Sequence, residues 1–149
     1  MASIELHRDF TVRRPVAEVF DLLADLETYL PQWAKGPVAV RKTTPGPKGA
    51  GTRLTVTARV GPVRVRSPYE ITAWQPHEVF GGSGTAGPFA FDEEYRLSEK
   101  PDGHTAVSYT IAAEPRGVFR IARRPLAARA RSLIDGDLAR FVRLAESRP

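Results

Sequence analysis

The sequence predicts an α+β domain in which a curved antiparallel sheet of seven strands wraps around one long C-terminal helix, with two short helices after the first strand. Residues 117–146 place apolar side chains at spacings of three and four, a pattern typical of a helix with one buried face. Most of the preceding residues alternate between polar and apolar side chains and are divided by turn signals, as in strands. No helical pattern separates the second strand from the seventh, so these strands are expected to pair antiparallel.

The N-terminal elements follow from alternation and from two helix-start signals. Residues 4–12 alternate between apolar and polar side chains and predict a half-buried first strand, in which Arg8 stands on the apolar side. Pro15 suits the first turn of a short helix, and Asp25 suits the N-cap of a second one that ends by Trp33. Two short helices joined so closely would form a V that closes one edge of the sheet.

Turn residues divide the middle of the chain into six further strands. We expect the first of them to start at Val38 and the others to cover residues 54–60, 63–71, 78–82, 89–98 and 105–111. Pro68 predicts a bulge or an unpaired position in its strand. Residues 82–87 match GxGxxG, but a strand rather than a helix follows them, so we interpret them as a flexible loop that could gate an interior cavity.

The long C-terminal helix contains two irregular positions. Pro125 predicts a kink or a fresh helix start, because proline removes a backbone donor and clashes with the preceding turn. Gly136 marks either the close approach of another backbone or a ligand, or a tolerated exposed glycine. The face opposite the apolar stripe is rich in arginine and carries Arg120, Arg123, Arg124, Arg129, Arg131, Arg140 and Arg143.

The composition of the 149 residues favours one domain that spans residues 1–149. The absence of cysteine excludes disulfides and thiol nucleophiles. Residues 1–11 do not resemble a signal peptide and no run approaches the length of a membrane span, so we expect a cytoplasmic protein without a transmembrane segment. The net charge of +5 is spread along the chain and the helix's arginine face has no aromatic residues, which argues against a nucleic-acid partner. The oligomeric state stays open.

Four segments together carry a resemblance to a known superfamily. They are residues 15–25 followed by Trp33, Gly51 and Thr52 at the start of a strand, residues 102–105 before the last strand, and residues 138–146 at the end of the helix. In this order, across essentially the whole chain, they resemble the START/Bet v 1-like (SRPBCC) helix-grip superfamily, and within it the polyketide cyclase/dehydrase-like lipid-transport group. The resemblance implies a sheet that curls around the C-terminal helix and leaves a cavity between them. It does not imply one chemistry, because that superfamily includes binders, transporters and enzymes.

Glu93 is the foremost candidate for a functional side chain. It lies between Phe91 and Tyr95 on the predicted inner face of its strand. Desolvation there would raise the pKa of its carboxyl group unless a cation pairs with it, and Arg8 is the natural partner. This pair either lines the cavity or is purely structural, unless a bulge turns one of the two side chains to solvent.

The other candidates share the inner face of the sheet or lie on the long helix. Tyrosine rings there would either fill the core, which is the commoner role, or present a hydroxyl group to a ligand. The predicted ligand-binding set is Arg8, Ser67, Tyr69, Phe89, Phe91, Glu93, Tyr95, Tyr109, Leu133, Gly136 and Asp137, and the catalytic candidates within it are Glu93, Arg8 and Tyr109. The three histidines lack metal-ligand spacing, so we expect no metal, and no motif indicates a cofactor.

Three functions fit these residues. The favoured one is the binding of a small hydrophobic molecule of lipid, polyketide or isoprenoid type in a cavity between the sheet and the C-terminal helix. The second is an aromatase/cyclase-like or dehydratase-like enzyme, in which Glu93 is a general base and Arg8 or a tyrosine polarises a carbonyl group. The third is an interaction module that uses the arginine-rich face of the helix. The sequence leaves open whether any reaction is catalysed.

Overall fold

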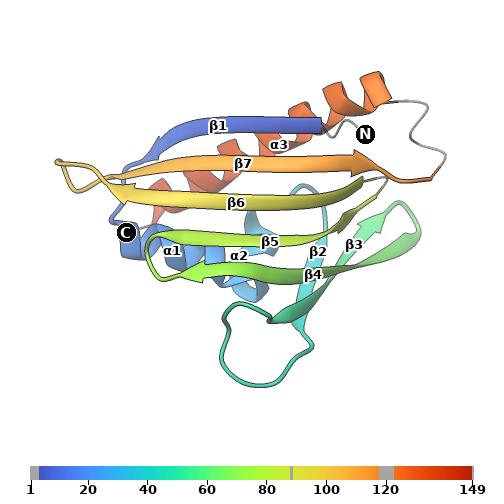
Figure 1. The fold of residues 1–149 in the computed structure, drawn as a ribbon, viewed down its shortest axis with the longest axis horizontal. Helices are drawn as coiled ribbons and strands as arrows, with labels where there is room; N and C mark the ends of the chain where they lie inside the picture. Colours follow the sequence, from blue (N-terminus) through green and yellow to red (C-terminus); the bar gives the residue numbers. More distant parts are fainter. Residues whose placement is uncertain (1–3, 88, 118–122, 149) are drawn as a thin grey trace.

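The protein has the predicted α+β architecture in the computed structural model, which describes residues 4–87, 89–117 and 123–148 (Figure 1). The elements follow in the order β1 (Ile4–Val12), α1 (Val16–Ala24), α2 (Leu26–Trp33), β2 (Val38–Lys42), β3 (Arg53–Val60), β4 (Val63–Gln75), β5 (Val79–Ala86), β6 (Phe89–Glu99), β7 (Thr105–Pro115) and α3 (Arg123–Ser147). None of the described helices is both long and apolar enough to cross a membrane.

The seven strands form one antiparallel sheet in the order β1-β7-β6-β5-β4-β3-β2. Neighbours in the sequence are neighbours in the sheet, except that β1 pairs with β7. Burial alternates along β1 from Ile4 to Val12, so one face of the sheet turns toward the core, as its period of two requires. All three helices lie on the same side of the sheet, behind the strands in the view of Figure 1.

The C-terminal half of α3 is anchored on the two short helices. Phe141 is fully buried, and its ring packs edge-to-face against Trp33 at the end of α2, with centroids 5.4 Å apart. The Nε of Arg140 donates to the carbonyl of Trp33 at 2.9 Å. The described backbone of α3 lies close to α1, α2 and β1 but has little contact with the middle strands of the sheet.

Two strand predictions were wrong in detail. The glycine-rich segment expected to be a loop is paired throughout as β5, between β4 and β6. Its glycines permit close packing, since a Cβ on Gly84 would lie 2.4 Å from the carbonyl oxygen of Pro68. Pro68 itself is paired opposite Thr55 within β4, and the irregularity falls between Ile71 and Ala73 instead.

Pro125 lies near the start of α3 as the structure describes it, from Arg123 onward. The kink or fresh helix start expected at this proline stays a prediction. Residues 118–122, which were expected to form the first part of this helix, lie outside the described residues. Asp25 is in the N-cap position of α2 as predicted, but its side chain makes no capping hydrogen bond.

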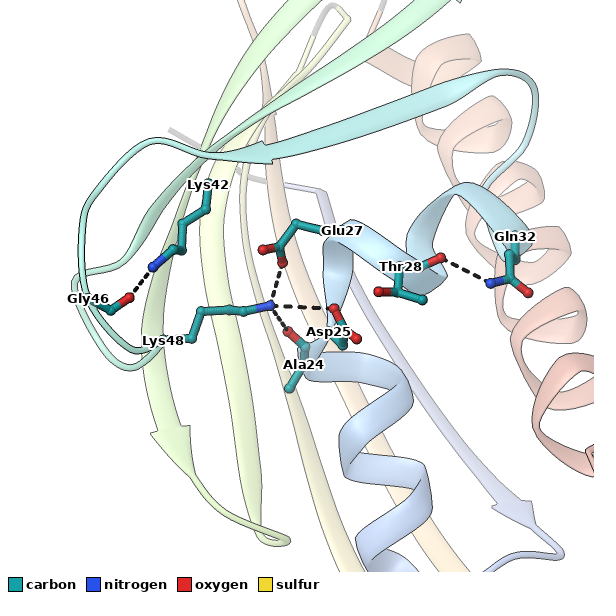
Figure 2. A network of polar contacts seen from close by, with 8 residues as sticks. All are labelled: Ala24, Asp25, Glu27, Thr28, Gln32, Lys42, Gly46 and Lys48. Atoms are coloured by element: carbon teal, nitrogen blue, oxygen red, sulfur yellow. Dashed lines mark hydrogen bonds and ion pairs between the residues drawn. The ribbon is translucent and has the colours of Figure 1, made fainter.

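The loop between β2 and β3 is tied to the junction of α1 and α2 (Figure 2). The Nζ of Lys48 lies 3.6 Å from Oδ1 of Asp25, and it also contacts the carboxylate of Glu27 and the carbonyl of Ala24. The carboxylate of Asp25 thus faces a lysine instead of capping its helix. Only 19% of the Lys48 side chain is exposed, so these contacts hold the loop against the V of the two helices.

Replacing Phe141 tests the anchor of α3. We expect Phe141→Ala to lower the free energy of unfolding by about 3–5 kcal/mol, because a fully buried ring leaves a cavity. Urea denaturation measures the change. The exposed neighbour variant Arg143→Ala should stay within about 0.5 kcal/mol of the parent. A loss below about 1 kcal/mol for Phe141→Ala would contradict the proposed anchoring.

Candidate functional site

The inner face of the sheet carries a carboxylate held by two tyrosines. The hydroxyl of Tyr69 donates to Oε2 of Glu93 at 2.9 Å, and the hydroxyl of Tyr109 donates to Oε1 at 2.9 Å. These side chains come from β4, β6 and β7, and Tyr95 lies beside them with its ring 4.5 Å from that of Tyr109. Glu93 and the three tyrosines therefore point to the inner face of the sheet, as predicted.

A glycine in β5 makes this arrangement possible. Tyr69 lies on β4, so its side chain must cross β5 to reach Glu93 on β6. The residue of β5 paired directly with Glu93 is Gly82, and a Cβ built there would lie 2.2 Å from the hydroxyl oxygen of Tyr69. No real Cβ contact is so short, so any other residue at position 82 would displace the tyrosine ring. Sequence reasoning missed this role of Gly82, because the glycine-rich pattern was interpreted as a loop.

Burial and a neighbouring charge raise the pKa of Glu93, whereas its hydrogen bonds lower it. Desolvation raises the pKa of its carboxyl group most, the two tyrosine hydroxyls oppose that shift, and the negative charge of Asp137 adds to it. The net effect is a raised pKa. Burial and the charge of Glu93 raise the pKa values of Tyr69, Tyr95 and Tyr109, so these three hydroxyls stay protonated and can donate.

Glu93 lies on the inner face of the sheet, among apolar side chains. Its carboxyl group is desolvated by the surrounding protein, and yet the residue keeps some accessible surface. The apolar residues Phe91 and Ile111 on the same face, and Ile134 on α3, are likewise only partly buried. The side chains around Glu93 are therefore not completely covered by the protein.

Two grooves lie mainly on the outer face of the sheet. One has a volume of about 690 Å³ and is lined by outward-facing residues such as Glu70, Ser83 and Asp92. The other has a volume of about 380 Å³ and includes Asp9 and Ser98. The first groove also includes Tyr69 and Phe91 of the predicted ligand-binding set, but Glu93 lines neither groove.

The predicted ion pair between Arg8 and Glu93 is wrong. The Nε of Arg8 lies 2.7 Å from Oδ1 of Asp135 on α3, and its Nη2 lies 3.2 Å from Oδ2. The side chains of Arg8 and Asp135 are 37% and 50% exposed, so the pair sits at the edge of the sheet. β1 is an edge strand next to α3, which brings a solvated carboxylate within reach, and the arginine avoids the desolvation that Glu93 would impose.

The remaining candidates differ in their contacts and in how deeply they are buried. Asp137 contacts Arg140, and its pKa is raised because burial outweighs that cation. Leu133 and Ser67 are half-buried, whereas Phe89 is buried in a separate cluster with Ile4 and Ala113.

No other backbone segment among the described residues approaches Gly136. A Cβ there would meet only the guanidinium group of Arg140, at an ordinary 3.5 Å. The described residues contain no cluster of three side chains that could bind a metal ion.

Comparison with known proteins assigns the family. A family model described as polyketide cyclase / dehydrase and lipid transport matches residues 3–146. The chain belongs to this family. An uncharacterized protein of Mycobacterium tuberculosis is 32% identical over 130 residues, which cover 85% of this chain and 72% of that protein. An uncharacterized protein of Mycobacterium bovis matches to the same extent.

Solved structures agree with the family fold at low identity. The Zhui aromatase/cyclase from a Streptomyces species has a TM-score of 0.77 and 19% identity, covering 97% of this chain and 94% of that chain. The structure of Ara h 8.0201 has a TM-score of 0.70 and 13% identity, covering 95% and 99% of the two chains. These likenesses support the helix-grip fold of the Bet v 1-like superfamily and say nothing of this chain's ligand.

Replacing Gly82 tests the packing of the site. We expect Gly82→Ala to displace the Tyr69 ring, break its hydrogen bond to Glu93, and lower the free energy of unfolding by about 1–3 kcal/mol. Chemical denaturation measures the stability. Gly49→Ala is the matched control, because nothing lies within 4 Å of its added Cβ and its φ is not positive. Equal stability of the Gly82 variant and the parent would show that Tyr69 does not lie over β5.

The raised pKa of Glu93 predicts a pH-dependent difference between the parent and Glu93→Gln. A carboxyl group with a raised pKa in the folded state contributes its full stability below the unfolded pKa of about 4.3. That contribution is lost as the pH rises through the folded value. The free energy of unfolding of Glu93→Gln minus that of the parent should therefore increase with pH across this window.

Denaturation at a series of pH values measures this difference. Carboxyl groups elsewhere titrate in both proteins and cancel in the subtraction. The outward-facing variant Glu94→Gln, on the next residue of β6, corrects for the removal of one carboxylate. A difference that does not change with pH would refute the raised pKa.

Proposed function

We propose that this protein binds a small hydrophobic ligand of lipid, polyketide or isoprenoid type, with a neutral hydroxyl group, in the hollow between the sheet and α3. The observation that carries the proposal is the cluster of Glu93 with Tyr69 and Tyr109 on an otherwise apolar inner face. Pockets for small molecules typically combine apolar walls with a few convergent polar groups, and this face has both.

The apolar part of the ligand would contact the half-buried side chains of the hollow. Phe91, Ile111 and Ile134 each keep accessible surface that a ligand would cover. Covering apolar surface is worth about 25 cal/mol per Å², so several such contacts favour binding without any charged group. The ligand's hydrophobic skeleton would supply affinity, and the polar cluster would set its orientation.

The polar part of the ligand follows from the hydrogen-bond inventory of the cluster. Each oxygen of the Glu93 carboxylate accepts one tyrosine hydroxyl and has further acceptor capacity, so a ligand hydroxyl can donate to it. A ligand carboxylate cannot donate there, and Glu93 and Asp137 together would repel its charge. The site therefore fits alcohols and phenols better than acids.

Retinol and retinoic acid test this preference, because they share an isoprenoid skeleton and differ in the terminal group. At neutral pH we expect retinol to bind at least about tenfold more tightly than retinoate, a difference of roughly 1.4 kcal/mol. Titration by fluorescence measures both affinities. Glu93→Gln should narrow the ratio, since it removes one of the repelling charges, whereas Glu94→Gln should leave it unchanged. Equal affinity for the two ligands, or no binding of either, would contradict the proposal.

One observation also favours an aromatase/cyclase-like activity as a second candidate. A carboxylate with a raised pKa beside phenolic donors can act as a general base toward an acidic C–H between two carbonyl groups. The similar Zhui protein is named an aromatase/cyclase. Under this alternative, incubation with a poly-β-ketone would give a cyclised product detectable by mass spectrometry. Glu93→Gln would lower its rate by about 100-fold or more. An unchanged rate would remove Glu93 as the base.

A further inference from the structure

The outer face of the sheet gathers arginines at the end formed by β2, β3 and β4. In the register of these strands Arg59 lies directly opposite Arg64, Arg66 lies opposite Thr57, and Arg41 lies opposite Thr55. All of them share one face, opposite to the buried Leu54, and all four arginines are exposed. We call Arg41, Arg59, Arg64 and Arg66 the arginine patch.

The arginine patch differs from the other arginines on the sheet in having no acidic partner. Arg53 pairs with Glu70 at 3.3 Å, and Arg96 pairs with Glu94 at 2.7 Å. Among the described residues, no carboxylate lies within ion-pair distance of the four patch arginines. Two like charges directly opposite each other on a sheet are destabilising. The patch therefore costs stability that an anionic partner would recover.

An exposed apolar tip adjoins the patch. The turn between β3 and β4 is formed by Gly61 and Pro62, and the next residue, Val63, is 57% exposed. Among the large hydrophobic side chains of the described residues, Val63 is the one that is exposed. At about 3.3 Å per residue, Arg64 and Arg66 lie roughly 3 and 10 Å behind Val63 along the strand. In Figure 1 this hairpin reaches the end of the sheet on the side away from the β6–β7 turn.

We propose that the β3–β4 hairpin docks this protein on an anionic lipid bilayer, with its apolar tip at the acyl boundary and the arginine patch on the phosphate groups. Amphipathic segments bind membranes in this way, and each basic residue near an anionic surface adds about 1 kcal/mol. A nucleic acid would use the arginines but not the tip, and the patch has no aromatic side chains on which bases could stack.

The inner face of the same hairpin leads toward the candidate site. Along β4, Val63 is exposed, Val65 and Ser67 are half-buried, and Tyr69 is buried against Glu93. If the hairpin docks by its tip, this row of side chains starts at the bilayer and ends at Tyr69. This last step rests on the proposed function, because it makes the bilayer the source or the acceptor of the hydroxylated ligand.

Vesicle sedimentation tests the docking. Full-length protein would be mixed with vesicles of phosphatidylcholine alone, or of phosphatidylcholine with about 30 mol % phosphatidylglycerol. We expect binding only to the anionic vesicles, with an affinity that falls steeply as salt rises. The double variant Arg59→Gln/Arg64→Gln should bind about thirty-fold more weakly, which corresponds to about 1 kcal/mol per arginine. Val63→Ser should also weaken binding, but without a change in the salt dependence.

The matched control is Arg53→Gln/Arg96→Gln, which removes two charges from the same outer face at ion-paired positions. It should keep most of the affinity. An equal loss in both double variants, equal binding to neutral vesicles, or tighter binding to duplex DNA than to anionic vesicles would each overturn the proposal. Thermal melting should show both double variants folded, and the loss of the like-charge pair should not lower the melting temperature. Retinol titration without vesicles separates failure of docking from failure of ligand binding.

Discussion

The hydrogen-bonded cluster of Glu93 with Tyr69 and Tyr109 is the constraint on which the interior of this protein depends. A carboxylate inside a protein is costly unless it is paired, and among the described residues no cation forms an ion pair with this one. Two phenolic donors take the place of a cation, and they come from strands on either side of β6. The cluster therefore requires β4 to β7 to keep one register, with Gly82 beneath the Tyr69 ring. A slip of one residue would turn Glu93 to the outer face.

The placement of α3 decides how much of the inner face stays open. Phe141 and Arg140 fix the helix on the V of α1 and α2, and the ion pair of Arg8 with Asp135 joins it to the edge strand. These contacts fix α3 against the short helices and the edge strand, and its described backbone has few close contacts with the middle strands. In a family that is described by both cyclase/dehydrase and lipid-transport members, chemistry can change with a few inner side chains while this frame stays the same.

Charge is divided between the two faces of the sheet. The inner face holds Glu93, and α3 carries Asp137 on the same side of the sheet; burial raises the pKa values of both carboxyl groups. The outer face near the β3–β4 turn holds the arginine patch without acidic partners among the described residues. A neutral, hydroxylated ligand suits the first surface, and an anionic bilayer suits the second. The net charge of +5 is thus more informative when its distribution over the sheet is known.

The sequence by itself determined the type and order of the elements and the inward direction of Phe91, Glu93 and Tyr95. Both are local properties, because the periods of strands and helices appear within a few neighbouring residues. It predicted only the first half of β5, at residues 78–82, and missed the rest, because glycines carry no side chains whose alternation could reveal a strand.

Only the tertiary structure decided which groups meet. Arg8 and Asp135 are 127 positions apart, and their pairing depends on the edge position of β1 beside α3. Gly82 became meaningful only when Tyr69 was seen to lie over it. Such contacts depend on distances between segments remote in the chain, and side-chain period fixes only the face on which a residue lies, not its neighbour across the core.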